Sequence, residues 1–143
     1  MTVTNETTQL EPHNTLDQRE CMEQLLDAGA NCSIAQIVYK KWLRNLRPAE
    51  PHDVVMMNAH PAKVDSYGDL HVEVHDDATG KWYPLVVMNV AVVPSSDFNL
   101  IGWSSYADQL KSAGAKRPRL LYGADAAMLP LGNGRCAMAK RRN

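Results

Sequence analysis

The sequence has no apolar run that approaches the roughly 20 residues a helix needs to cross a bilayer. Residues 1–11 are polar and contain no apolar segment of the kind found in secretion signals. Cysteine is also scarce: the 3 cysteines form no pair with metal-binding spacing, which favours free thiols in a reducing compartment. We therefore expect a cytoplasmic protein that does not enter a membrane.

A strong excess of one charge is missing as well, since the formal net charge is −1 at pH 7. Bulk electrostatic attraction to nucleic acid is therefore not expected, although residues 140–142 form a short basic tail. His71 and His75 fall on one face of an expected strand, but their spacing puts them about 13 Å apart, too far to share one ion. We expect neither a metal site nor a cofactor.

The residues that are present favour one domain built mainly of strands. The length of 143 residues and the hydrophobic content of 45% allow a single core. Polar and apolar residues alternate over 69–75, which predicts a strand with one buried face. Residues 82–93 are almost continuously apolar, which predicts a strand buried on both faces. Residues 104–113 have the pattern of a short late helix that Gly114 ends. Such a chain favours a small closed or sandwiched β structure.

The most informative stretch is Leu25-Leu26-Asp27-Ala28-Gly29-Ala30, where an apolar pair leads into an aspartate and a turn of small residues. We expect a buried strand to end at this aspartate. About seventy residues later, Phe98-Asn99-Leu100-Ile101-Gly102 forms a second apolar stretch that ends in glycine. Two further stretches lie between them, Tyr67-Gly68-Asp69-Leu70 and the segment from Met88 to Pro94.

Taken in this order, these stretches resemble the protease domain of Copia-type (Pseudoviridae) retrotransposons, which belongs to the retropepsin family of aspartic proteases. The similarity covers roughly residues 22–115. It divides the chain into a flexible N-terminal segment over 1–19, a retropepsin-like domain over 20–131, and a C-terminal strand with a basic tail over 132–143. The implied fold is mainly β, a small closed β-barrel of the retropepsin type with one short late helix.

The resemblance also implies an aspartic endopeptidase that is active as a homodimer. Each subunit of such an enzyme supplies one aspartate, and the pair activates a water molecule that hydrolyses a peptide bond. Asp27 would be the catalytic residue, in a turn completed by Ala28, Gly29 and Ala30. The Gly29 N–H is expected to support the carboxylate, and the glycine to allow a close turn. The implied substrate is an extended peptide segment of a polyprotein.

Two other segments gain expected roles from the same resemblance. A flap around residues 56–66 would close over the peptide and pair with its backbone as an added strand, with residues 64–74 as its second strand. The segment Leu100, Ile101 and Gly102 would pack beneath the aspartate turn and hold it rigid. The residues of the flap expected to bind substrate are Met57, Asn58, Ala59 and His60.

The chain departs from the family pattern at Ala28, where active members carry serine or threonine. In the family this hydroxyl reaches across the dimer axis to the backbone of the other subunit, and alanine has no such group. One alternative is therefore a catalytically degenerate domain of the same fold that serves dimerisation or peptide binding. A second alternative is an interaction domain in which residues 21–31 form the second helix and the turn of an ankyrin-like repeat.

Overall fold

The computed structural model describes residues 2–5, 21–122, 126–132 and 134–140. The protein is mainly β, with 50% strand and 14% helix, as the sequence predicts. Most strands belong to one large sheet in the order β2-β1-β8-β9-β4-β10-β3, with β5 paired to β8. The strands of this sheet are β1 (Thr2–Asn5), β2 (Cys21–Glu23), β3 (Leu25–Asp27), β4 (Ile34–Ala35), β5 (Leu43–Pro48), β8 (Ser66–His75), β9 (Trp82–Val92) and β10 (Leu100–Gly102).

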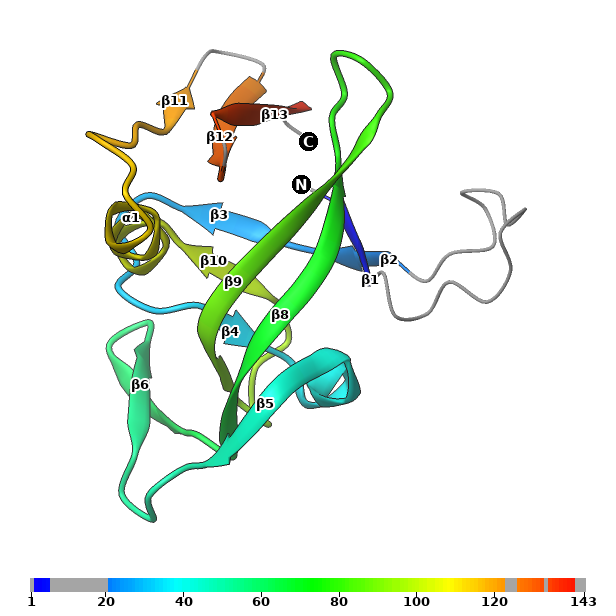
Figure 1. The fold of residues 1–143 in the computed structure, drawn as a ribbon. Helices are drawn as coiled ribbons and strands as arrows, with labels where there is room; N and C mark the ends of the chain where they lie inside the picture. Colours follow the sequence, from blue (N-terminus) through cyan, green and yellow to red (C-terminus); the bar gives the residue numbers. More distant parts are fainter. Residues whose placement is uncertain (1, 6–20, 123–125, 133, 141–143) are drawn as a thin grey trace.

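The strands β8 and β9 form a long antiparallel hairpin at the centre of the sheet (Figure 1). The alternation predicted over residues 69–75 is confirmed, because Leu70, Val72 and Val74 are all buried. The prediction that 82–93 is buried on both faces holds only for residues 90–93. Before that point accessible positions are interspersed with buried ones, and β9 has β4 as a neighbour only at its end, at Ala91 and Val92.

In the described part of the chain, two helices accompany the sheet. The predicted late helix is α1 (Trp103–Ser112), which buries Tyr106, Ala107 and Leu110 against the sheet. The second is a 3-10 helix, η3 (Ile37–Trp42), between β4 and β5. No helix among the described residues is long and apolar enough to cross a membrane.

The closed barrel that the resemblance implies is not found among the described strands, because the large sheet has two ends, β2 and β3. The two end strands are consecutive in the chain, separated only by Gln24. The strand β2 pairs with β1, and β3 pairs with β10. The chain itself therefore connects the two ends of the sheet, and no ladder between β2 and β3 closes it.

The chain ends add strands to this core. Thr2–Asn5 form β1 between β2 and β8, whereas a flexible segment was expected over 1–19; residues 6–19 lie outside the described part. At the other end, β11 (Leu121–Tyr122), β12 (Ala126–Leu131) and β13 (Arg135–Lys140) form a three-stranded sheet beside the turn of the β8–β9 hairpin (Figure 1). The basic tail expected after β13 lies beyond the described residues, apart from Lys140.

The C-terminal sheet packs on the rest of the protein through both apolar and polar contacts. Leu129 is fully buried in the main hydrophobic cluster, and the Tyr106 hydroxyl of α1 donates to the Pro130 carbonyl at 2.9 Å. The Asp76 carboxylate, in the turn of the central hairpin, accepts the Met138 N–H at 2.9 Å. β12 and β13 thus pack against the same core as the large sheet.

Candidate active site

Asp27 is the last residue of β3, and its carboxylate lies in the turn that follows. The Gly29 N–H donates to Oδ1 of Asp27 at 2.9 Å, which is the contact expected from the sequence. The Ala30 N–H donates to the Asp27 carbonyl at 3.3 Å and closes the turn. Asp27, Ala28 and Gly29 are all exposed in the single chain. The carboxylate is therefore held by the backbone of its own turn and is accessible from outside.

The strand before Asp27 is less buried than the sequence predicts. Leu26 packs against the main hydrophobic cluster, but Leu25 is 55% exposed. Side chains two apart on a strand share a face, so Leu25 and Asp27 lie together on the open face of β3. The prediction of a buried strand is thus correct for one face only. Leu26 faces the core, whereas Leu25 is exposed next to the Asp27 carboxylate.

The segment expected to support this turn is β10, which lies between β3 and β4. It runs parallel to β3, with Leu100 opposite Leu25, Ile101 opposite Leu26 and Gly102 opposite Asp27. It runs antiparallel to β4. Ile101 is only 1% exposed and belongs to the main cluster. The loop 28–33 therefore connects β3 and β4, the two strands that flank β10.

Gly102 is the glycine that this arrangement requires. A Cβ atom at residue 102 would lie 2.4 Å from the Cys32 carbonyl oxygen, closer than a real Cβ contact comes. At Gly29, by contrast, a Cβ would lie 3.6 Å from the Asp27 carboxylate, an ordinary contact, and the backbone φ is not positive. Gly29 lies in the turn that the sequence predicts, and the close approach between two backbone segments occurs at Gly102.

Two buried polar residues that the sequence did not single out fasten β10 at both ends. Ser33, 1% exposed, accepts the Gly102 N–H on its Oγ at 3.1 Å. Asn99, 4% exposed, accepts the Gln36 N–H on Oδ1 at 2.9 Å and donates from Nδ2 to the Glu23 carbonyl at 3.1 Å. A signal for Asn99 was present, since it stands inside the motif 98–102, but no pattern marked Ser33.

The expected flap corresponds to a separate hairpin of β6 (Val54–Met57) and β7 (His60–Lys63). Asn58 and Ala59 form its turn, with φ of 51° and 64°, as a two-residue hairpin of the primed type requires. The second strand of the hairpin is therefore β7. The expectation that residues 64–74 form that strand is wrong, because Ser66–His75 belong to the large sheet as β8.

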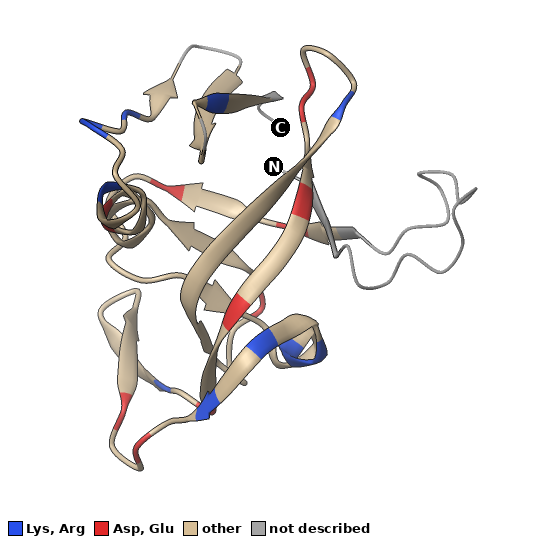
Figure 2. Cartoon of the chain, in the orientation of Figure 1, with Lys and Arg blue, Asp and Glu red and all other residues tan. Residues whose placement is uncertain are grey.

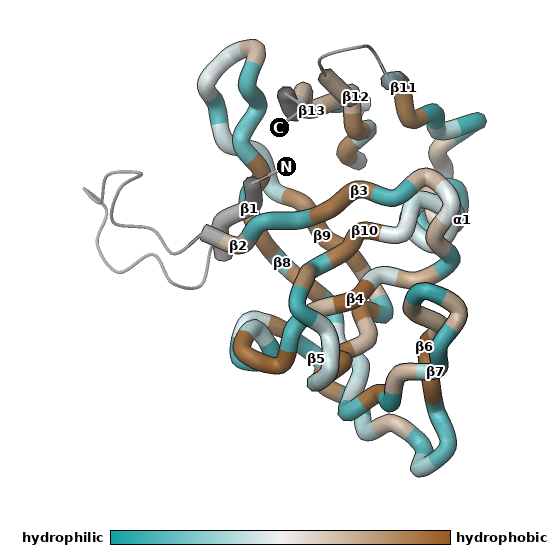
Figure 3. Tube along the Cα trace, turned by 180° about the vertical axis from the view of Figure 1, so that it is seen from behind, coloured by the Kyte–Doolittle hydropathy of each residue, from teal (hydrophilic) through white to brown (hydrophobic). Residues whose placement is uncertain are grey.

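The β6–β7 hairpin lies on the same side of the molecule as the loop 28–33 that follows Asp27, here called the aspartate loop. Two opposite views agree on this (Figures 1 and 3). Val55, Met57 and Ala62 of the hairpin pack on a small hydrophobic cluster that also contacts Cys32 of the loop and Leu100 of β10. The opposite face carries Val54 and Met56, which are 52% and 65% exposed.

The base of the hairpin is anchored to the large sheet by a tyrosine. The Tyr67 hydroxyl donates to Oδ2 of Asp53 at 3.1 Å, and the Val64 N–H donates to the Asp53 carbonyl at 3.1 Å. Partial burial, and then the neighbouring Asp53 carboxylate, raise the pKa of Tyr67 above its ordinary value. The tyrosine therefore stays protonated and keeps its role as donor.

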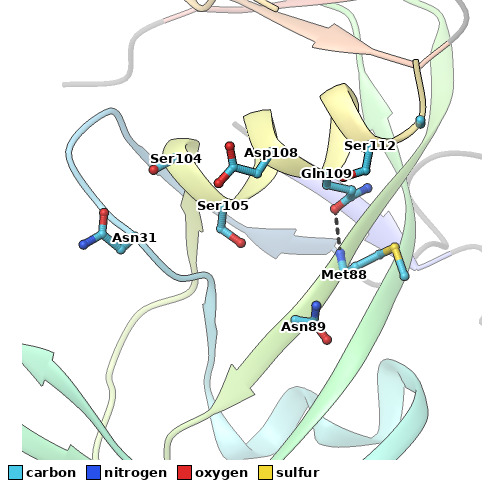
Figure 4. A pocket seen from close by; sticks show the side chains of 9 residues that line it. Asn31, Met88, Asn89, Ser104, Ser105, Asp108, Gln109 and Ser112 are labelled. Atoms are coloured by element: carbon cyan, nitrogen blue, oxygen red, sulfur yellow. Dashed lines mark hydrogen bonds between the residues drawn. The ribbon is translucent and has the colours of Figure 1, made fainter. Parts of the chain in front are cut away.

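An open polar pocket of about 730 Å³ lies between α1, β9 and the loop residue Asn31 (Figure 4). Gln109 of α1 reaches β9 there: its Oε1 accepts the Met88 N–H at 2.9 Å, and its Nε2 donates to the Val86 carbonyl at 2.8 Å. The other residues that line it are Asn89, Ser104, Ser105, Asp108, Ser112 and Ala113.

Basic residues are concentrated at one place, although α1 beside the end of β3 also carries Asp108 and Lys111. Lys and Arg gather on η3 and β5, on a different side of the protein from the aspartate turn (Figure 2). Within the described residues no group of three or more His, Cys, Asp and Glu side chains is placed to hold a metal ion. Burial raises the pKa of the Cys32 thiol, which keeps it protonated and a poor nucleophile.

Comparison with known proteins gives no match to this chain among protein-family models, curated proteins or solved structures. Its function must therefore be inferred from the arrangement around Asp27: an accessible carboxylate held by a backbone N–H, with β10 inserted between the two ends of its loop and a hairpin beside it.

Proposed function

We propose that the protein is an aspartic endopeptidase of the retropepsin type, derived from a Copia-like retrotransposon polyprotein. The observation that carries the proposal is the turn at the end of β3, where the Gly29 N–H holds the Asp27 carboxylate at 2.9 Å in an accessible position. Such a hydrogen bond fixes a carboxylate without removing it from water, which is what a group that must exchange protons with water requires.

One chain supplies only half of the chemistry that this reaction needs. Peptide hydrolysis by aspartates uses two carboxylates that share one proton, because adjacent like charges cannot both ionise at low cost. In this proposal a second copy contributes the second Asp27 across a twofold axis. The open face of β3, with Leu25 exposed beside the carboxylate, supports an interface or a peptide contact there, since the exposed leucine gains from being covered.

The proposed reaction then follows from the two protonation states of the pair. The ionised carboxylate accepts a proton from a water molecule, whose oxygen attacks the carbonyl carbon of the scissile bond. The protonated carboxylic acid donates a hydrogen bond to the carbonyl oxygen, and collapse of the tetrahedral adduct expels the amine after proton transfer. The β6–β7 hairpin would close over the substrate peptide, and residues 57–60 would be the part of the hairpin nearest to that peptide.

A second candidate function is a peptide-binding or dimerisation domain that keeps this fold without catalysis. Ala28 is the observation that favours it, because no hydroxyl is available beside Asp27 to bond the partner subunit. Each lost buried hydrogen bond costs on the order of 1 kcal/mol, and twofold symmetry loses two. A displacement of about 1 Å in the catalytic geometry can cost a hundredfold in rate.

The ankyrin-like alternative is not supported. It requires a helix over residues 21–31, but these residues form β2, Gln24, β3 and a turn. The Asp27 carboxylate stands at the end of a strand, not on a helix.

Peptide cleavage by the purified protein between about pH 4 and 7 tests the proposal. We expect wild type to cleave an extended apolar peptide, Asp27→Asn to abolish cleavage, and Ala28→Ser to raise both the rate and the affinity of the dimer, measured by sedimentation. Cleavage that survives Asp27→Asn would contradict the proposal. A stable dimer without cleavage in either wild type or Ala28→Ser would favour the binding domain.

A further inference from the structure

We propose that Ser33 is a positioning residue for Asp27, which holds the aspartate loop from within its own subunit; the inference rests on the proposed function for its catalytic consequence. The Ser33 hydroxyl oxygen accepts the Gly102 N–H at 3.1 Å, and the side chain is 1% exposed. Gly102 stands opposite Asp27 in the parallel pairing of β10 with β3. Ser33 and Asp27 thus lie at the two ends of one loop. Gly102 is the partner of both, through a hydrogen bond to Ser33 and through strand pairing with Asp27.

The Ser33 hydroxyl replaces a backbone carbonyl as the acceptor for the Gly102 N–H. The ladder between β4 and β10 contains the single residue pair Leu100 with Ile34. β4 begins only at Ile34, whereas β10 continues past the paired Leu100 to Gly102, whose N–H donates to the Ser33 side chain and not to a strand carbonyl. A buried N–H without an acceptor is costly. Ser33 supplies the acceptor and carries the contact between loop and strand one step beyond the ladder.

The backbone around Gly102 and Cys32 is closely packed, so it cannot shift to give the Gly102 N–H another acceptor when the Ser33 hydroxyl is removed. A Cβ at residue 102 would lie 2.4 Å from the Cys32 carbonyl oxygen and 2.7 Å from its carbon. The Ser104 N–H of α1 also donates to the Ala30 carbonyl, at 3.3 Å, in the middle of the loop. The loop is therefore fastened by residues 102–104 at two points, and the tighter of them depends on Ser33.

This geometry separates positioning from substrate contact. Ser33 is buried against β10, whereas Asp27, Ala28 and Gly29 are exposed at the other end of the loop. A change at Ser33 therefore acts on the rate of the chemical step through the placement of Asp27. It leaves the binding of the peptide, which uses the open face, nearly unchanged.

The first test is amide hydrogen exchange of residues 25–34, followed by mass spectrometry, in three variants of the full chain. We expect Ser33→Ala to speed exchange of this segment by about tenfold, the equivalent of roughly 1.4 kcal/mol. Ser33→Thr keeps the hydroxyl and should restore slow exchange. Ser66→Ala is the matched control, because Ser66 is a 5% exposed serine of β8, outside the loop, whose hydroxyl donates to the Asp65 carboxylate.

The second test is the kinetics of peptide cleavage in the same variants. We expect Ser33→Ala to lower kcat by about tenfold or more with KM unchanged, and Ser33→Thr to recover most of the loss. Equal exchange in Ser33→Ala and Ser66→Ala overturns the inference, whether or not the protein cleaves peptides. Absence of cleavage in wild type overturns the proposed function alone, since the exchange measurement still decides whether Ser33 holds the loop.

Discussion

Asn45 and Asn89 lie on different strands, yet both have a left-handed backbone, with φ of 53° and 57°, and both bind the carboxylate of Asp69. Asn45 donates from Nδ2 at 3.2 Å, and Asn89 donates from its backbone N–H at 3.1 Å. The registers of β5 with β8 and of β8 with β9 both shift at this place. One carboxylate therefore stabilises two neighbouring irregularities of the large sheet.

Acid should weaken this arrangement. Burial by itself raises the pKa of Asp69, but the hydrogen bonds from Asn89, Asn45 and Arg47 outweigh it and hold the pKa below its ordinary value of 3.8. A carboxyl with a lowered folded-state pKa contributes stability above the ordinary value, and loses it as the pH falls through the folded value. We expect the free energy of unfolding to fall below about pH 4.

Asp69→Asn is the variant that isolates this contribution. At pH 7 it should be less stable than wild type by about 1–2 kcal/mol, because the charge-assisted hydrogen bonds are lost. The difference should shrink on acidification, as urea unfolding monitored by circular dichroism can measure. A difference that stays constant between about pH 7 and pH 3 would contradict the role assigned to this carboxylate.

Asp76 should control the attachment of the C-terminal sheet. Its carboxylate accepts the N–H groups of Met138 and Ala78 and the hydroxyl of Thr79; the Met138 contact is the largest cause of its lowered pKa. We expect Asp76→Ala to accelerate amide exchange in β13 more than in β8, at a cost of about 2–3 kcal/mol in stability. Asp97→Ala, at an exposed turn, is the control.

Gly102 should be far more sensitive than Gly29 to the same added methyl group. Gly102→Ala drives a Cβ into the Cys32 carbonyl and should cost about 2 kcal/mol or more in stability. Gly29→Ala meets only the Asp27 carboxylate, at 3.6 Å, and should unfold at nearly the wild-type temperature. Thermal unfolding compares the two. Equal losses would show that the loop 28–33 is packed differently from the structure described here.

Ala59 is strained at the turn of the β6–β7 hairpin, because alanine at a φ of 64° places its Cβ near the following carbonyl. Ala59→Gly should raise the free energy of unfolding by about 1 kcal/mol, provided that the hairpin unfolds together with the domain. Ala62→Gly, in β7, should have the opposite sign, because it removes a packed methyl from a strand. Chemical denaturation of both variants provides the comparison.

The elements that the sequence predicts best are those set by local pattern. The expected helix over 104–113 is displaced from α1 by one residue at each end, and the expected strand over 82–93 is one residue longer than β9. The hydrogen bond from Gly29 to Asp27 spans two residues, and it too could be anticipated. Short-range periodicity and turn chemistry contain enough information for such features.

The features that sequence reasoning missed depend on distant partners. Ser33 meets Gly102 across 69 positions, and Asn99 meets Glu23 across 76. No local pattern marks Ser33 as buried, and the motif that contains Asn99 does not reveal which distant backbone group it binds. The exposure of Leu25 was missed for the same reason: an apolar residue in a strand predicts burial, but whether another element covers that face is decided by the tertiary arrangement.

Gln109 has a consequence for how other chains can approach the protein. By occupying the outward Val86 carbonyl and Met88 N–H, its amide imitates one residue of an adjoining strand. A strand from another molecule cannot pair with β9 at this point without first displacing the Gln109 side chain. This edge of the sheet is therefore protected against edge-to-edge aggregation.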